Sequence, residues 1–415
     1  MRRLGIGLVA LLTAAAATWA AETQAGPGLS TVLRTNYYSS SKSLDDASDF
    51  AGATFQLTAL PKFTSTLDGK LFARATQPAI GKGGRARGRL VEGYLTLHLD
   101  HADLSVGKQI VAWGRADGIN PTDNLTPRDY TVMLPFEDDQ RLGTASAKLD
   151  VALSQEHTLT LFVAPRLEPS TVPLPREAYP VVRQRPSGSA SNAQVGLRLN
   201  KVGEGADWSL SYFHGHSLLP SFGVPRADAA TALHYDRISV LGADFAKNFG
   251  RFGVRGEASY TRTRDTSGTD PLVRNPQLFW VLGVDRTFFE NLNLNVQVFQ
   301  RRVIHFHRPD AAALPPQELR LALQNALLAG QQDRSNHGIT FRVGNKWLHD
   351  TLEAELFAVV NAQRRNSLIR PLVTYTFSDH VKGTVGAEYF RGAPGTQYGS
   401  LRKNSGVFAE LRLAF

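Results

Sequence analysis

The acidic segment 113–140 is the part of the chain whose residue types most directly suggest chemistry. It carries six carboxylates, among prolines and glycines that keep it out of regular secondary structure: Asp117, Asp123, Asp129, Glu137, Asp138 and Asp139. Their spacing matches no helix–loop–helix calcium motif, so bound calcium is only a weak alternative, and no metal or other cofactor is expected. Two interpretations stay open: a solvated surface loop, or a loop folded into a pore, where its acids would face basic groups and create a transverse field.

Charged residues elsewhere recur on one side of short alternating segments. At the C-terminus, Val407, Ala409 and Leu411 share one parity, whereas Glu410 and Arg412 share the other. A period of two is typical of a β-strand with one apolar and one polar face. The pattern predicts that a set of charged side chains from many such strands lines one interior: Arg74, Arg89, Arg198, Arg255, Arg301, Arg342, Lys382, Arg412, Glu92, Glu257 and Glu388. No catalytic residue is predicted.

The elements that would position these residues are the strands of a barrel that crosses a membrane. Residues 1–21 have a basic start, an apolar run and a small-residue end, which predicts a cleaved signal peptide. No stretch of 22–415 is apolar enough for a membrane-spanning helix. Because lipid cannot bond to the backbone, such a sheet must close, with charges inside and aliphatic residues outside. The predicted fold is therefore all-β, a single transmembrane antiparallel β-barrel over 22–415.

Turn and loop lengths alternate along the chain, which predicts short periplasmic turns and long outer loops. Counting back from the last strand gives about 18 strands, with 16 as the alternative. The longest predicted loops are 113–140, 166–191, 216–234 and 304–334. In the last of these, Pro315-Pro316 and leucines at helical spacing predict a short helix over 316–329. This helix would either enter the pore mouth or lie on the outer surface.

Composition excludes several other classes of protein. The chain has no cysteine, which rules out disulfides, thiol nucleophiles and cysteine-ligated zinc. Its formal charge of +9 is not gathered into a basic helix or a recognition motif, so no nucleic-acid partner is expected.

One segment resembles a known family. It reads G-K-Q at 107–109, W-G at 113–114 and N-P-T-D at 120–123, and it is similar to the G-(R/K)-Q…W-G…N-P-x-D segment of an uncharacterised porin-like family of proteobacterial outer-membrane barrels. The chain also ends on Phe415, as such barrels do. The resemblance implies an outer-membrane barrel and a channel, and it supplies no substrate.

The function predicted from these features is a channel in the bacterial outer membrane for passive passage of small solutes, narrowed by loop 113–140. The expected partners are outer-membrane lipid and lipopolysaccharide, a small-molecule solute, and the barrel-assembly machinery, which would read the C-terminal strand. Two alternatives are an outer-membrane enzyme of the lipase or protease type and a structural or adhesive barrel. An enzyme is not the prediction, because no G-x-S-x-G or comparable grouping is present.

Overall fold

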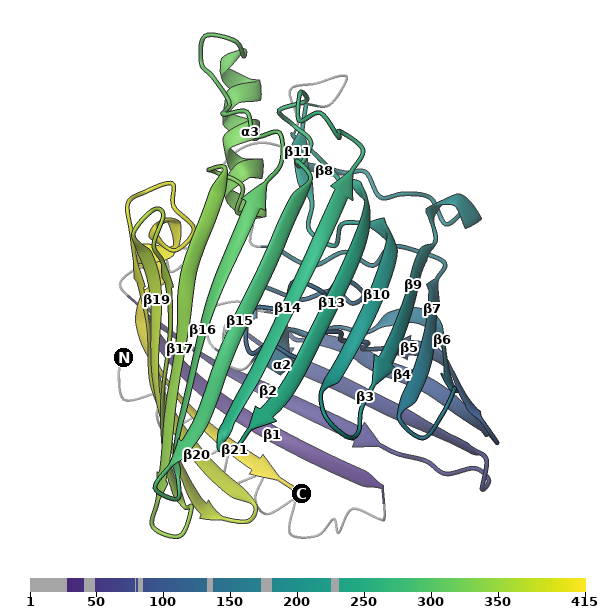
Figure 1. Ribbon diagram of the computed structural model, residues 1–415. Helices are drawn as coiled ribbons and strands as arrows, with labels where there is room; N and C mark the ends of the chain where they lie inside the picture. Colours follow the sequence, from purple (N-terminus) through teal and green to yellow (C-terminus); the bar gives the residue numbers. More distant parts are fainter. Residues whose placement is uncertain are drawn as a thin grey trace.

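A computed structural model describes residues 28–40, 49–78, 80, 85–132, 137–172, 181–224 and 231–415 (Figure 1). The predicted signal peptide, 1–21, lies outside the described residues. Eighteen strands form one sheet. They are β1 Leu29–Ser40, β2 Asp49–Ala59, β3 Leu67–Gln77, β4 Arg87–Leu99, β5 Ala102–Gln109, β6 Thr144–Ala152, β7 His157–Ala164, β9 Gln194–Lys201, β10 Asp207–His216, β13 Arg237–Phe249, β14 Phe252–Thr263, β15 Gln277–Phe288, β16 Leu292–Val303, β17 Ser335–Trp347, β18 Leu352–Asn361, β19 Asn366–Ser378, β20 Val381–Arg391 and β21 Gly406–Ala414.

The sheet closes into a barrel by pairing its first strand with its last. β1 and β21 run antiparallel from Val32 opposite Ala414 to Ser40 opposite Gly406. Beyond this ladder, the backbones of Thr31 and Phe415 exchange two N–H···O bonds of 2.9 Å each. The terminal Phe415 therefore completes the seam. The predicted 18-stranded barrel is confirmed, and the alternative of 16 strands is wrong.

The two faces of the barrel have opposite chemistry. On the outer face, Leu241 and Val407 are each 58% exposed, whereas Asp244 and Glu410, on the inner face of the same strands, are buried. A soluble barrel would place its apolar side chains inside, so this arrangement is that of a barrel in lipid. Phe408 is an exception to the alternation, because it faces inward and lies 5.7 Å from the ring of Tyr38, centroid to centroid.

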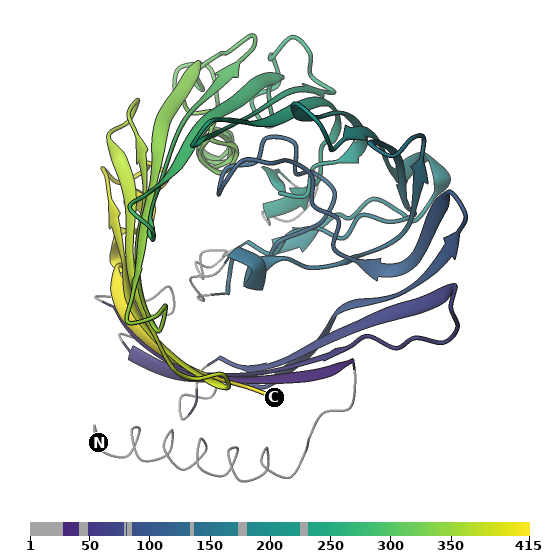
Figure 2. The ribbon, with the colours of Figure 1, turned by 60° about the horizontal axis from the view of Figure 1, so that its bottom comes forward.

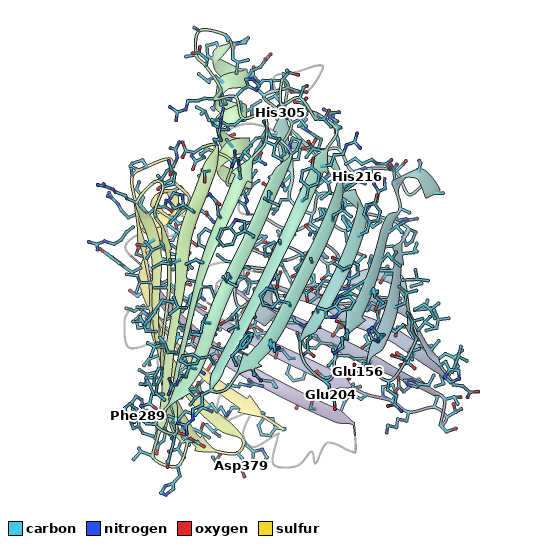
Figure 3. All side chains as sticks on the ribbon, in the orientation of Figure 1. Glu156, Glu204, His216, Phe289, His305 and Asp379 are labelled. Carbon is cyan, nitrogen blue, oxygen red and sulfur yellow. The ribbon has the colours of Figure 1, made fainter. Side chains whose placement is uncertain are left out.

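The connections at the two ends of the barrel differ in length. Figure 3 shows Glu156, Glu204, Phe289 and Asp379 at the end with the short turns. His216 and His305 lie at the other end, where the long connections begin (Figure 3). These connections hold the small elements α2 Glu137–Gln140, β8 Val181–Arg183, η1 Ala190–Asn192, β11 Ser221–Gly223, β12 Thr231–His234 and η2 Gly399–Asn404.

Helix α3, Pro316–Ala329, covers the residues of the predicted helix. It rises beyond the ends of β16 and β17 on the long-loop side and does not cross the barrel (Figure 1). Asn325 fixes it there, because its side chain bonds to the backbone N–H and C=O of Phe222 in β11, at 2.6 and 2.8 Å. Neither α2 nor α3, nor any other helix among the described residues, is long and apolar enough to cross a membrane.

Two adjacent residues of β19, Val373 and Thr374, allow a test of which face of the barrel meets lipid and which faces the interior. Val373 faces outward and is 41% exposed, whereas Thr374 faces inward and bonds to Thr384 across the ladder at 3.0 Å. Val373→Arg places a charge in the middle of the lipid face, so we expect it to lower the free energy of unfolding by roughly 2–4 kcal/mol. Urea titration of the barrel in lipid vesicles, followed by heat-modifiable migration, measures this loss. Thr374→Arg is the control and should cost clearly less; equal losses would contradict the assignment.

Candidate functional site

The segment 113–140, which we call the infolded loop and which the structure describes at 113–132 and 137–140, follows β5 and in these residues turns into the barrel instead of away from it. Figure 2 shows this part of the chain inside the ring of strands. Its first residue, Trp113, is 3% exposed and packs in an apolar cluster with Leu125 of the same loop and Phe162 and Phe213 of the wall. Gly196 on β9 makes room for the indole, because a Cβ there would lie 2.8 Å from Trp113 Cη2. Burial of a Trp side chain is a large apolar contribution, so it anchors the start of the loop.

A buried carboxylate on the wall holds the next residues. The backbone N–H groups of Arg115 and Ala116 each donate to Glu257 Oε1 at 2.5 Å. Thr122 donates to Oε2 through its hydroxyl at 3.0 Å and through its N–H at 3.4 Å. Gly114 permits this approach, since its φ is +102° and a Cβ would lie 2.4 Å from Glu257 Oε1. A single charged acceptor on β14 therefore satisfies several backbone donors of the loop.

The side chain of Arg115 reaches a second acid on the wall. It pairs with Asp244 on β13 and donates to Asn200 Oδ1 at 2.7 Å. Asp244 also receives Arg198 at 3.3 Å and the hydroxyl of Ser209. Both Glu257 and Asp244 are buried, and buried charges are costly unless paired and hydrogen-bonded. Within the described chain, every hydrogen bond to Glu257 comes from the loop. Asp244, by contrast, would keep Arg198 and Ser209 on the wall and lose only Arg115 if the loop left the barrel.

The tip of the loop meets the wall at β16 and β17. Gln297 donates to the backbone oxygen of Asp117 at 2.6 Å and accepts from its N–H at 3.4 Å. The carboxylate of Asp117 forms an ion pair with Arg342 at 3.1 Å, and Arg342 also pairs with Glu355 at 3.4 Å. The side chains of Asp117 and Arg342 keep exposed fractions of 30% and 31%, so this pair is open to the interior of the barrel.

The other described acids of the loop serve two purposes. Asp123 closes the loop on itself, because it pairs with Arg128 at 3.1 Å and with Arg141 at 2.8 Å. Asp129 reaches Arg89 on β4 at 3.0 Å. Asp139, in α2, pairs with Arg34 on β1 at 2.6 Å and with Arg74 on β3 at 3.5 Å. Glu137 and Asp138 were predicted as constriction acids too, but their side chains lie outside the described part of the chain.

The remaining predicted acids and bases lie on the inward side of their strands, yet few of them touch the loop. On β4, Arg89 and Glu92 differ in parity, and the shift in the β3–β4 register places them opposite Arg74 and Phe72, which share one parity of β3. Arg255 donates to the backbone oxygen of Arg115 at 3.4 Å and pairs with Asp285 at 2.8 Å. Glu92 accepts from the N–H of Ile110, just before the loop, at 3.1 Å. Glu388 on β20 pairs with Arg370 on β19 at 2.5 Å, so this ion pair joins two strands of the wall.

Three predicted basic residues lie away from the infolded loop. Arg301 stacks on Phe279 at 4.3 Å and donates to the oxygen of Ala329 at 2.8 Å. It therefore caps the C-terminal end of α3, where a cation is favourable. Lys382 and Arg412 are opposite each other on β20 and β21 and are exposed near the short-turn end.

Arg115, Asp244 and Gln297 are functional residues that the sequence reasoning missed. Asp244 lies on the polar parity of β13, so the alternation of the sequence could have placed it inside the barrel. Nothing in the sequence pairs it with Arg115, which is 129 positions away. Arg115 and the amide of Gln297 carry no periodic signal for a loop contact at all.

The chemistry available at this site is electrostatic. Among the described residues, no group of three or more His, Asp and Glu side chains could hold a metal ion. The arrangement puts acids on a loop inside the barrel and guanidinium groups on the facing walls. Charges fixed across a narrow passage act on any polar solute that enters it.

Comparison with known proteins supports the fold. A family described as a protein of unknown function (DUF1302) matches residues 86–277, just under half of the chain, and the match includes the segment 107–123. No curated protein matches by sequence.

Solved structures with similar folds are porins of Pseudomonas aeruginosa. OccK9 (OpdG) is 12% identical with a TM-score of 0.56, over 94% of this chain and 97% of that one. OccK2 (OpdF) is 10% identical with a TM-score of 0.56, over 94% and 96%. OccK1 (OpdK) is 10% identical with a TM-score of 0.55, over 93% and 97%. At this identity the likeness shows the fold alone, a closed antiparallel barrel.

The Glu257 anchor generates a direct test. Glu257→Gln replaces one acceptor oxygen with an NH₂ group that faces backbone donors, so we expect it to destabilise the docked loop by about 1–3 kcal/mol. Trypsin added to the folded barrel should then cleave after Arg115 or Arg128 roughly five- to 150-fold faster, as measured by mass spectrometry of the fragments. The matched control is Glu353→Gln, an exposed inward acid on β18 without a described contact to the loop. Unchanged cleavage in Glu257→Gln would show that the loop is held by other contacts.

Proposed function

We propose that this chain is a channel of the bacterial outer membrane through which small hydrophilic solutes pass passively. The observation that carries the proposal is the infolded loop, which lies inside a closed barrel and is tied to its walls by buried ion pairs and hydrogen bonds. A structural or adhesive barrel would have no need for a charged loop held across its interior.

The lining of the barrel supports a path for polar solutes. The inward parity carries acids and bases on strands all around the ring, whereas the outward parity is mainly apolar, with polar residues such as His214 and Ser239 near strand ends. The porin structures described above share this barrel fold over almost their whole length. Because the Asp117–Arg342 pair joins loop and wall and stays partly exposed to the interior, a passing solute would meet a negative and a positive charge side by side there.

The expected partners follow from the same proposal. The apolar outer face would contact outer-membrane lipid and, on the long-loop side, lipopolysaccharide. The barrel-assembly machinery would recognise the C-terminal strand, β21, whose Phe415 completes the seam with Thr31. The diffusing partner is a small-molecule solute.

A hydrolase is the second candidate, and one contact bears on it. His214 Nδ1 lies 2.8 Å from the hydroxyl of Ser239, and the two residues are paired across β10 and β13 on the outward parity. A catalytic triad also needs a group that orients the histidine. Within the described chain, no carboxylate forms an ion pair with His214, so the geometry favours the channel.

Planar-bilayer recordings test the channel and its constriction together. We expect the wild-type protein to give stepwise currents in KCl. Arg342→Gln removes a fixed positive charge and should move the reversal potential in a salt gradient toward cation selectivity, whereas Asp117→Asn should move it toward anion selectivity.

The control is Arg308→Gln, whose side chain is 70% exposed in an outer loop. This variant should leave the reversal potential close to that of the wild type. Absence of currents from correctly folded protein would contradict the channel function. Equal shifts in all three variants would contradict the assignment of the constriction.

A further inference from the structure

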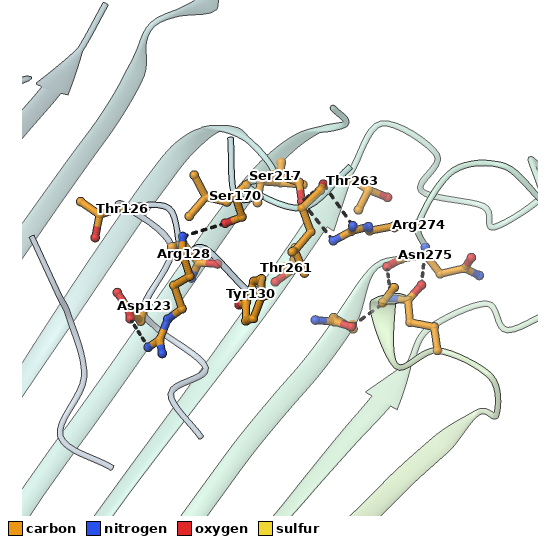
Figure 4. Close-up of a pocket in the computed structure, with 17 residues that line it drawn as sticks. Asp123, Thr126, Arg128, Tyr130, Ser170, Ser217, Thr261, Thr263, Arg274 and Asn275 are labelled. Carbon is orange, nitrogen blue, oxygen red and sulfur yellow. Dashed lines mark hydrogen bonds and ion pairs between the residues drawn. The ribbon is translucent and has the colours of Figure 1, made fainter. Parts of the chain in front are cut away.

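A cavity of about 160 Å³ lies inside the long-loop end of the barrel, between the infolded loop and the wall (Figure 4). The loop contributes Asp123 and Arg128, β14 contributes Thr261, and β15 contributes Gln277. The connection before β15 contributes Arg274. None of these residues belongs to the Asp117–Arg342 pair, so the cavity is separate from the constriction.

The charges around this cavity do not balance. Asp123, its lining acid, is already shared by Arg128 at 3.1 Å and by Arg141 at 2.8 Å. Arg274 donates only to neutral acceptors: the hydroxyl of Ser217 at 3.0 Å and the carbonyls of Leu219 and Pro220 at 3.1 and 2.9 Å. In the part of the chain that the structure describes, no carboxylate lies within ion-pair distance of Arg274. The cavity is therefore cationic.

Asp236, the acid whose charge acts on Arg274 through space, has closer partners of its own. Asp236 accepts from the hydroxyl of Ser221 at 2.6 Å and pairs with His234 at 3.4 Å. Burial would raise the pKa of Asp236, but hydrogen bonds from His234 and Ser221, together with the positive charges of His234 and Arg274, outweigh burial and hold it below its usual value. Burial lowers the pKa of Arg274, as expected for a guanidinium withdrawn from water, with Asp236 and Tyr130 acting only at longer range. A cation in such surroundings is stabilised by an anion that enters from outside the chain.

Neutral hydrogen-bonding groups face the same space. Gln331 donates to the side-chain oxygen of Gln277 at 2.9 Å, which leaves the NH₂ group of Gln277 for another acceptor. Neither that NH₂ group nor the hydroxyl of Thr261 has a protein partner among the described residues. In Figure 4, Arg128 and Arg274 lie on either side of Thr261. A ligand at this place would meet a guanidinium together with hydroxyl and amide groups.

We propose that this cavity is an outer binding site for a small hydroxylated carboxylate. The carboxylate would accept a single charge-assisted hydrogen bond from Arg274, because both Nη2 hydrogens of its guanidinium already go to the carbonyls of Leu219 and Pro220. The hydroxyl groups would bond to Thr261 and Gln277. A cavity of about 150 Å³ holds a benzene-sized molecule, so the ligand has roughly six to eight non-hydrogen atoms. This inference deepens the proposed channel function, on which it rests, by naming a class of solute captured before the constriction.

The test is isothermal titration calorimetry on the full-length barrel in detergent, with four probes. Glycerate carries a carboxylate and two hydroxyl groups, acetate lacks the hydroxyls, glycerol lacks the charge, and inorganic phosphate offers a different anion. We expect glycerate to bind, acetate to bind more weakly and glycerol to give no heat of binding. Phosphate binding tighter than glycerate would overturn the assignment to carboxylates.

Two variants assign the binding to this cavity. Arg274→Gln should weaken glycerate at least about tenfold, since it removes a charge-assisted hydrogen bond. Thr261→Val keeps Arg274 and should weaken glycerate roughly threefold while leaving acetate unchanged. Arg264→Gln, in the same connection but 62% exposed, is the charge-matched control and should change neither affinity.

Each outcome is informative even if a variant misfolds. Arg274 also ties down the segment 217–220, so loss of folding in Arg274→Gln leaves the decision to Thr261→Val. Equal affinities in the wild type and Thr261→Val, or no glycerate binding to the wild type, would overturn the proposal. Because calorimetry needs no current, glycerate binding without conductance would keep this site and refute only the channel.

Discussion

Every feature of this protein depends on one constraint: in lipid, the backbone must satisfy its own hydrogen bonds. Eighteen strands meet that constraint by closing on themselves, with β1 paired to β21 and the last residue bonded to Thr31. Closure creates an inside and an outside, and the two-residue period of a strand then assigns each side chain to one of them. The apolar residues face lipid, and the charged residues gather in an interior that has room for a loop.

The loop occupies that interior because the walls offer it buried partners. Glu257 would be an expensive charge if the loop left, since its donors in the described chain all come from the loop. Asp244 would lose Arg115 while keeping its donors on the wall. Trp113 adds apolar burial, and Gly114 allows the backbone to approach Glu257 closely. Together these contacts fix the infolded loop to the wall, so that loop and wall form one folded unit. They also explain the W-G pair of the sequence, in which each residue has its own task.

The ion pairs inside the barrel differ in their surroundings, and this separates structural from solute-facing roles. Asp139 with Arg34 and Asp244 with Arg115 are largely buried and hold the loop in place. Asp117 with Arg342 keeps nearly a third of each side chain exposed, so its charges reach the passage. Arg274 lies at the long-loop end of the barrel and has no acid within ion-pair distance in the described chain. This distinguishes its cavity from the three ion pairs named above, in which each cation has an acid in contact.

The sequence by itself determined the barrel, the inward position of its charged side chains and the bounds of α3, and it reduced the number of strands to 18 or 16; the structure decides for 18. These properties are local: strand period, turn length and helix signals each depend on residues close together in the chain. Only the tertiary structure decided where the infolded loop goes and what it touches. The contact of Arg115 with Glu257 joins residues 142 positions apart, and that of Asp139 with Arg34 joins residues 105 apart. No periodicity encodes such pairs, because they depend on which strands closure of the ring brings within reach of the loop.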